Sequence, residues 1–468
     1  MKIAHPLLRQ AGVIVFFVLI ACLALYWPLA HATTHIPGRY TTDYFHFHWN
    51  MWWIQHALTD ADASVYETNY VMFPYTSNLG YHTLTPFWFP LWAVFEPLIG
   101  TLAAFQLFFV IGLALTGWFF YLWMRHEGLS PGGALIGGAA LELSPILMYF
   151  ISWSMMDLIT WFWIPAHLLI WSLVARQADH RWHGWVIAAG QGILFWWMGL
   201  ADLQYFIYGA PLLVPFGILT LIRAKSWRCR ARLASMALLA VGISAALLWF
   251  FGPLSHIGGL DRGQLVPPPV ETTPHLKFPA DFLNPNPDFM VDPDPAAYLL
   301  PLLALSLAVY LTPLRRKTWQ GQDRRWFWLA LAVLPWLLSL GASITILGQK
   351  INLPYRLLYE SFDGILRFPF RFSLGFIMPV LIFIALTWQP LIKTRTARRI
   401  ALAGMMLVIL ATTNVLRPMD IQPAPTVYEF YETMGAEDAD YVVVEVPVAA
   451  GTGEVWIGNF SDIETEFY

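Results

Sequence analysis

A lone carboxylate in an aromatic segment after the first apolar stretch is the residue best suited to chemistry. Residues 43–58 contain neither glycine nor proline, so they are predicted to form a helix, which the hydroxyl of Thr42 can cap. With about 100° of rotation per residue, Asp43, His46 and Asn50 share one face of that helix. A carboxylate on a polar face can serve as a general base. The alternative role is structural, because a negative charge in the first turn also stabilises the helix dipole.

Histidines are frequent in the same part of the chain and raise the question of a metal site. They include His46, His48, His56 and His82. Zinc needs three or four convergent ligands, whereas His46 and His48 point to different faces of a helix. We therefore expect no metal ligands here and no required cofactor, with a divalent metal as the alternative. Hydrogen-bonded histidines at the membrane interface are the preferred interpretation, and His46, Asn50 and His82 are also predicted to contact the substrate or its phosphate.

Further charged residues lie where apolar stretches begin or end. Asp157 and Asp202 occupy short connections, and ionisable groups near the membrane usually face a polar cavity. Glu142 lies deeper inside an apolar stretch, where a structural and a functional role are equally expected. Arg367 and Arg371 flank a Phe-Pro-Phe segment. Because guanidinium groups bind phosphate in a bidentate manner, these two arginines are predicted to hold a phosphate, or alternatively to anchor the chain to anionic lipid headgroups.

The composition indicates which elements must position these residues. The 468-residue chain is 57% hydrophobic and 12% charged, whereas soluble proteins carry about 25% charged residues. Its net charge of −3 gives no indication of nucleic acid binding. Backbone groups in lipid must be satisfied within a helix, so an all-α polytopic membrane protein is predicted. About eleven spans are expected, at residues 11–30, 101–124, 132–151, 155–175, 184–200, 204–222, 233–253, 297–314, 326–341, 372–390 and 398–416.

The distribution of basic residues predicts an orientation. Most of the 27 basic residues fall on one side if the N-terminus is cytoplasmic, which agrees with the positive-inside rule. The apolar run 11–30 is long enough to act as an uncleaved anchor instead of a signal peptide. A plasma (inner) membrane location with an extracytoplasmic C-terminus follows. The large outer loops are then 31–100, 254–296 and 342–371, the first of which contains an apolar, proline-interrupted stretch at 87–100 expected to be re-entrant or interfacial.

The chain therefore divides into a membrane domain, 1–416, and an extracytoplasmic segment, 417–468. The run Tyr441–Val446 is rich in β-prone residues, so the segment is expected to begin a small α/β or β domain that is truncated.

Several of these features resemble the GT-C superfamily of multispan glycosyltransferases. The similar segments are residues 43–58, Tyr70–Pro74, His82–Pro86 and Arg367–Arg371. The superfamily keeps its catalytic acid just after the first span, where Asp43 lies, and a second acidic position that Asp157 matches. Many members carry two adjacent acids in the first loop, whereas Tyr44 follows Asp43 here. That departure weakens a metal-dependent version of the mechanism.

The resemblance implies transfer of a sugar from a polyprenyl-phosphate donor to an extracytoplasmic glycan, lipid or protein acceptor, with inversion. Asp43 would be the base, Asp157 would orient the acceptor or assist the base, and Arg367 and Arg371 would stabilise the phosphate leaving group. Membrane lipid is a further expected partner, and nucleic acid is not. The alternatives are a transporter or flippase of lipid-linked envelope precursors, which would be expected to contain inverted repeats, and a non-catalytic envelope assembly protein.

Overall fold

The structure is a computed structural model. It describes residues 4–38, 42–60, 63–71, 74–177, 182–257, 299–312, 324–346, 349–362, 366, 368–392, 394–413, 417–424, 433–434, 436, 450–451 and 456–457.

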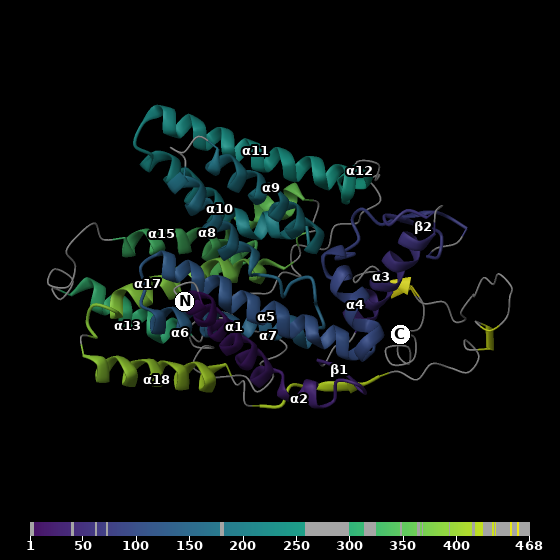
Figure 1. Cartoon of the computed structure of the whole chain (residues 1–468), viewed down its shortest axis with the longest axis horizontal. Helices are drawn as coiled ribbons and strands as arrows, with labels where there is room; N and C mark the ends of the chain where they lie inside the picture. Colours follow the sequence, from purple (N-terminus) through teal and green to yellow (C-terminus); the bar gives the residue numbers. More distant parts are fainter. Residues whose placement is uncertain are drawn as a thin grey trace.

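Apolar helices make up most of the described chain, as predicted for an all-α multi-pass membrane protein (Figure 1). Six helical stretches of the described residues are long and apolar enough to cross a membrane. They are α5 (Thr101–His126), α6 with α7 (Pro131–Glu142 and Pro145–Ser152), α9 (His183–Ala201), α10 (Gln204–Arg223), α11 (Trp227–Phe251) and η6 with α17 (Pro369–Phe372 and Ser373–Trp388).

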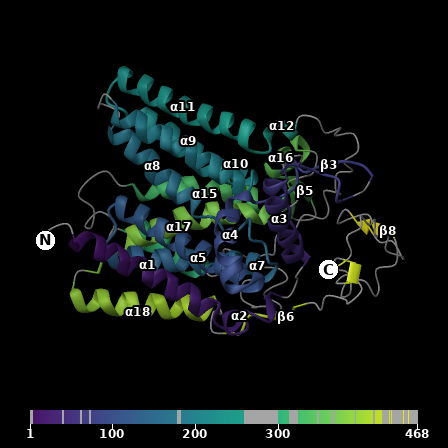
Figure 2. The same ribbon diagram turned by 45° about the vertical axis from the view of Figure 1, so that its right-hand side comes forward.

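The remaining predicted spans also contain helices, which are shorter or less apolar. They are α1 (Ala4–Ala24), α8 (Trp163–Gln177), α13 (Leu300–Leu311), α15 (Arg325–Ser339) and α18 (Arg395–Thr412). Figures 1 and 2 show α11 and α9 along one edge of the bundle and α18 along the opposite edge, with α5 and α17 between them.

Two of the predicted spans are interrupted, one of them at a proline. Pro145 begins α7, and Ser144 before it has extended backbone angles, so α6 and α7 are separate helices. This agrees with the preference of proline for the first turn of a helix. The predicted span 155–175 is wrong over its first part, because residues 153–162 form turns and α8 begins only at Trp163.

Close packing of α1 against α5 and α6 depends on glycine. Phe17 of α1 is completely buried. A Cβ atom at Gly138 would lie 2.6 Å from the Phe17 ring and 2.7 Å from the carbonyl oxygen of Gly117. A side chain at either glycine would therefore push the helices apart, since contacts below 3 Å are not tolerated in a packed core.

The segments outside the bundle include two helices and several short strands. Helix α3 (Thr42–Thr59) confirms the helix predicted at 43–58, and η1 (Pro86–Trp88) leads into α4 (Phe89–Ile99), which packs on α5. Antiparallel pairs form between β1 (His35–Pro37) and β6 (Ile421–Pro423), β2 (Glu67–Thr68) and β3 (Ser77–Asn78), β4 (Ser343–Ile346) and β5 (Gln349–Asn352), and β7 (Ala450–Gly451) and β8 (Trp456–Ile457).

Three short helices complete the described elements, namely α2 (Tyr26–Ala30), α12 (Leu254–Ile257) and α16 (Tyr355–Ser361). The strand predicted at 441–446 and most of the predicted loop 254–296 lie outside the described residues.

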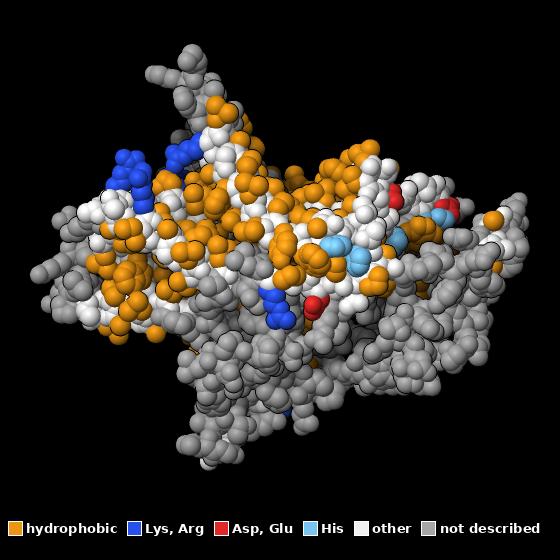
Figure 3. Space-filling model, turned by 90° about the horizontal axis from the view of Figure 1, so that it is seen from below, with side chains coloured by type: hydrophobic (Ala, Val, Ile, Leu, Met, Phe, Trp, Pro, Cys, Tyr) orange, Lys and Arg blue, Asp and Glu red, His pale blue; other side chains and the backbone are white. Residues whose placement is uncertain are grey.

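Basic residues gather at one end of the bundle. Arg223 at the end of α10 lies 5.4 Å from the Phe327 ring of α15, and Arg324 lies 3.9 Å from Glu127, which directly follows α5. Figure 3 shows two groups of basic side chains toward the left of the visible face, further basic atoms near its middle beside an acidic side chain, and the visible histidines toward the right. The two ends of the bundle therefore differ in charge.

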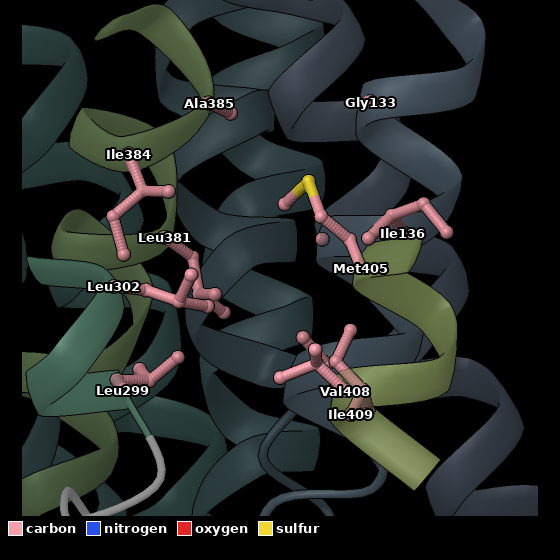
Figure 4. Close-up of a pocket in the computed structure, with 12 residues that line it drawn as sticks. Gly133, Ile136, Leu299, Leu302, Leu381, Ile384, Ala385, Met405, Val408 and Ile409 are labelled. Atoms are coloured by element: carbon pink, nitrogen blue, oxygen red, sulfur yellow. The ribbon is translucent and has the colours of Figure 1, made fainter. Parts of the chain in front are cut away.

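An apolar pocket lies between α6, α13, α17 and α18 (Figure 4). Its lining includes Ile136, Leu302, Leu381 and Met405, and none of the residues that line it is charged or polar. The pocket has no group that can transfer a proton, so the candidate site lies elsewhere.

Candidate functional site

Residues 153–162, between α7 and α8, bring the first part of the chain close to Asp157. Ser154 has a positive φ of 57°, and its hydroxyl donates to the carbonyl oxygen of Pro37 at 2.9 Å. The indole Nε1 of Trp88 donates to the carbonyl oxygen of Met156, also at 2.9 Å. These two bonds fix the connection against the segments that precede α3 and α4. Asp157 is therefore held beside the predicted first outer loop.

Asp157, Asp202 and Arg371 form one buried polar cluster, although they come from distant parts of the sequence. Their exposed fractions are only 6%, 7% and 7%. Asp202 follows α9, and its Oδ1 accepts the backbone N–H of Gln204 at 2.8 Å. Gln204 Oε1 in turn accepts from Arg371 Nη1 at 2.9 Å and from the Tyr208 hydroxyl at 2.8 Å. Two predicted site residues, Asp157 and Arg371, thus belong to one cluster, beside the end of α9 and the start of α10.

Burial dominates the electrostatics of the two carboxyl groups. It raises the pKa of Asp157 well above its ordinary value, and the neighbouring Asp202 raises it further. Burial also raises the pKa of Asp202, although the Gln204 N–H and the Arg371 guanidinium oppose that rise. The cluster therefore carries fewer negative charges at neutral pH than its two acids suggest.

Three atoms of the cluster have no hydrogen-bond partner within the described part of the chain. They are Asp157 Oδ1, Asp202 Oδ2 and Arg371 Nε. Buried polar atoms are nearly always satisfied by protein, water or a ligand. The cluster thus keeps both acceptor and donor capacity for a small polar group.

A second group of predicted residues joins His46 and Asn50 of α3 with His82, which lies between β3 and η1. Asn50 Nδ2 donates to the carbonyl oxygen of Thr83 at 2.7 Å, so its Oδ1 is free to accept from His82 Nε2, also at 2.7 Å. The imidazole rings of His46 and His82 stack with centroids 4.2 Å apart and planes inclined by 3°. The three side chains predicted to contact a substrate therefore lie together, and their role in binding stays a prediction.

Both histidines of this group are neutral at physiological pH. Burial lowers the pKa of His46 to about 4, partly opposed by a hydrogen bond to the Thr83 backbone. Burial, followed by repulsion from His46, lowers the pKa of His82 to about 3. The His46 Nε2 atom is buried without a hydrogen-bond partner among the described residues, so this nitrogen is available to a ligand.

Asp43 lies in the first turn of α3, and its side chain is half-buried. The next residue, Tyr44, is 3% exposed, and its ring packs 4.9 Å from that of Phe105 in α5. This contact fixes the first turn of α3 on the bundle. His46 lies three residues after Asp43, which is almost one helical turn. Asp43 and His46 are therefore on the same side of α3.

Sequence reasoning left out part of the polar cluster. Gln204, Tyr205 and Tyr208 were not predicted, although Gln204 and Tyr208 are four residues apart and so share a face of α10. The polar residues Gln204 and Tyr208, which follow Asp202 at helical spacing, could have indicated from the sequence that they belong to the same site. Arg367, the second predicted phosphate ligand, lies outside the described residues.

A metal site would need a different arrangement of ligands. Throughout the described ranges, no group of three or more His, Cys, Asp or Glu side chains is placed to hold a metal ion. The two acids of the polar cluster face an arginine, which supplies the positive charge beside them.

Comparison with known proteins adds no assignment. No protein-family model matches the chain, and no curated protein matches it. The resemblance of its short motifs to the GT-C superfamily therefore stays a prediction.

Proposed function

We propose that the protein is a membrane glycosyltransferase that moves a sugar from a polyprenyl-phosphate donor to an extracytoplasmic acceptor. The observation that carries the proposal is the convergence of Asp157 and Arg371 in a buried polar cluster tied to the segments around α3. A glycosyl transfer site at a membrane needs such polar groups at one end of an apolar bundle. Helix α3 adds the carboxylate of Asp43 and the neutral His46, whose ring stacks on the neutral His82.

The proposal includes an orientation for the chain. The eleven predicted spans would place the N-terminus in the cytoplasm and the C-terminal segment outside, in the inner membrane of the cell. The gathering of basic residues at one end of the bundle supports this, because such residues favour the cytoplasmic side. Both polar groups then belong to the outer half of the protein.

The proposed reaction is a single displacement. Asp43 removes the proton of an acceptor hydroxyl as its oxygen attacks the anomeric carbon. The bond between that carbon and the phosphate oxygen breaks, and polyprenyl phosphate leaves with the bonding electrons. Inversion at the anomeric carbon follows. One carboxylate is enough, because phosphate leaves as a stable anion, whereas hydrolysis of a glycoside uses two carboxyl groups.

The surroundings of Arg371 favour a different role from the predicted phosphate contact. Its guanidinium donates to Gln204, stacks 4.5 Å from the Phe368 ring and faces two acids. A phosphate in this position would lie beside Asp202, at an electrostatic cost. We therefore assign Arg371 to holding the acidic pair in place, and we leave phosphate stabilisation to Arg367.

Substitution of Asp43 tests the proposal. Proteoliposomes containing the full chain are supplied with radiolabelled polyprenyl-phosphate hexoses and pentoses and with an envelope extract as acceptor. The release of polyprenyl phosphate is measured. We expect the Asp43→Asn variant to lose about 10²–10⁴-fold in rate, because a general base contributes that much. The matched control is Asp60→Asn, which removes an exposed carboxylate just beyond the other end of α3.

Two results would contradict the assignment. The first is an Asp43→Asn variant that keeps the full rate at normal abundance. The second is an unsubstituted protein that releases no polyprenyl phosphate from any donor under conditions in which it is folded.

A transporter of lipid-linked precursors is the second candidate, and the buried charged cluster is the observation that favours it. Ionisable side chains within membrane proteins often belong to proton relays and substrate pathways. A transporter would carry a fluorescent polyprenyl-phosphate sugar across the bilayer without cleaving it. Measurement of movement and of cleavage in the same vesicles separates the two functions.

A further inference from the structure

Glu142 is a completely buried acid that belongs to neither of the two polar groups. It lies near the middle of the apolar stretch Pro131–Ser152, and its exposed fraction is 0%. Neither of its carboxyl oxygens has a hydrogen-bond partner within the described part of the chain. Such a carboxyl group requires an explanation, because buried polar atoms are nearly always satisfied by protein, water or a ligand.

The side chain of Glu142 lies in the junction of α1, α5 and α6. A Cβ atom added at Gly117 of α5 would lie 2.7 Å from Glu142 Oε2 and 2.5 Å from the Phe17 ring of α1. Gly138 precedes Glu142 by about one turn on the same face of α6, and a Cβ atom there would lie 2.6 Å from the same ring. The carboxyl group is therefore packed against glycine backbone and an aromatic ring, with no space for a methyl group at Gly117.

The described helices on the other side of α6 place no positive charge beside this junction. Helix α17 contains no titratable residue, and the basic residues of α18 are confined to its first five residues. These residues precede Leu402, which packs against Gly132 at the opposite end of α6 from Glu142. Neither α17 nor α18 therefore supplies a partner for an ionised carboxylate.

The basic residues of α1 and α5 are also far from the carboxyl group. Arg9 of α1 and Arg125 of α5 each lie more than two helical turns, or about 12 Å along the helix axis, from the residue that meets it. The described titratable group that interacts with Glu142 is the thiol of Cys22 on α1, and a thiol is ordinarily neutral at pH 7. An ionised Glu142 would thus be an unpaired charge inside the bundle, which is far more costly than a neutral acid.

We propose that Glu142 is a proton-binding site, which holds its proton at neutral pH while α1, α5 and α6 are packed together and releases it only when these helices separate. Release requires separation because an ionised carboxylate needs water or a cation beside it. The site thus links proton release to a change in helix packing. It is separate from Asp157 and Asp202, and it does not depend on the proposed sugar transfer.

Infrared spectroscopy of the full-length protein in nanodiscs at pH 7.5 tests the proposal. A protonated carboxyl group has a carbonyl stretching band separate from those of carboxylates and amides. Incorporation of ¹³C-labelled glutamate is expected to move such a band, and Glu142→Gln should remove it, because the amide has nearly the same shape but carries no acid proton. Glu67→Gln, which removes an exposed carboxylate, is the control and should leave the band unchanged.

Two results would overturn the proposal. The first is an unsubstituted protein in which labelled glutamate moves no band of a protonated carboxyl group, a result that does not require any variant to fold. The second is a band that persists unchanged in Glu142→Gln. A monovalent cation as the ligand would give the first result together with a melting temperature that Na⁺ raises in the unsubstituted protein but not in Glu142→Gln.

The dependence of stability on pH provides an independent measurement. A glutamate in the unfolded chain loses its proton near pH 4.3, whereas the folded protein keeps the proton on Glu142, so unfolding at neutral pH releases one proton. From pH 5.5 to 7.5, the unfolding equilibrium constant of the unsubstituted protein should therefore rise relative to that of Glu142→Gln, by up to about tenfold per pH unit. The histidines affect both proteins alike. An equal dependence on pH in the two proteins would show that Glu142 is not protonated in the folded state.

Discussion

The stacked rings of His46 and His82 are compatible with the fold only while both are neutral. Their centroids are 4.2 Å apart, so two positive charges would repel each other strongly in this partly dry environment. The hydrogen bond from His82 Nε2 to Asn50 also fixes one tautomer of the ring. A neutral histidine pair beside Asp43 offers nitrogen acceptors to a ligand without adding charge.

This arrangement predicts lower stability in mild acid. Both pKa values are lowered, to about 4 and about 3, whereas in the unfolded chain they lie near 6.5. As the pH falls from about 6.5 toward 4, the unfolded chain binds protons that the folded protein does not bind, so the free energy of unfolding decreases. The melting temperature in detergent should therefore fall between pH 7.5 and pH 4.5.

The variant His82→Gln isolates this contribution. The Nε2 of glutamine can replace the histidine donor to Asn50 but does not titrate. We expect its melting temperature to depend less on pH than that of the unsubstituted protein. An equal dependence on pH in the two proteins would contradict this explanation.

At the scale of the elements, glycine allows the closest helix contact described above. Gly138→Ala would place a methyl group 2.7 Å from the backbone carbonyl of Gly117 and 2.6 Å from Phe17, and neither α5 nor α6 can shift without disturbing the core. We expect a loss of about 1–3 kcal/mol in stability, as is usual for overpacking. Thermal unfolding in detergent measures it.

A matched glycine on another helix provides the control for this prediction. Gly190 of α9 has no atom within 4 Å of an added Cβ. Gly190→Ala should therefore keep or slightly raise stability, because alanine favours a helix more than glycine does. If the two substitutions had equal effects, packing against Phe17 would not be the cause.

The elements differ in how far the sequence predicted them. Helix α3 was predicted to within one residue at each end, because residues 43–58 lack glycine and proline. The start of α8 was missed, since the stretch before Trp163 is as apolar as a span but is buried inside the protein in turns. Apolar composition alone does not distinguish a segment facing lipid from one covered by protein.

The candidate site was predicted in part for a similar reason. His46 and Asn50 are four residues apart, so helical periodicity predicted that they share a face. The meeting of Asp157 with Asp202 and Arg371 depends on how α8, α10 and α17 pack, and no local pattern encodes that. The sequence therefore identified Asp157 and Arg371 as candidate site residues but did not predict that they lie together.

At the scale of the whole molecule, the separation of basic residues from the polar cluster predicts a topology. Cys22 and Cys229 are free cysteines and can be replaced by serine. Single cysteines are then introduced at Gln55 of α3 and at Lys225, both of which are exposed. A membrane-impermeant maleimide should label position 55 in right-side-out vesicles and position 225 in inverted vesicles.

The proposed orientation fails if both positions are labelled from the same side. Labelling of position 55 only in inverted vesicles would place the polar groups at the cytoplasmic face, where the proposed acceptors do not occur. In that case the glycosyltransferase proposal would also have to be abandoned.

The pairing of β1 with β6 has a consequence for the order in which the protein is assembled. Strand β1 lies directly before α3, whereas β6 follows the last helix of the bundle, and further bonds join Gly38 to Asp420 and Ala424 to Thr34. Residue 424 has to leave the ribosome before β1 and β6 can form all of these backbone hydrogen bonds. The segment that carries Asp43 therefore acquires its final support only after all the helices of the described bundle have been translated, so premature activity during membrane insertion is disfavoured.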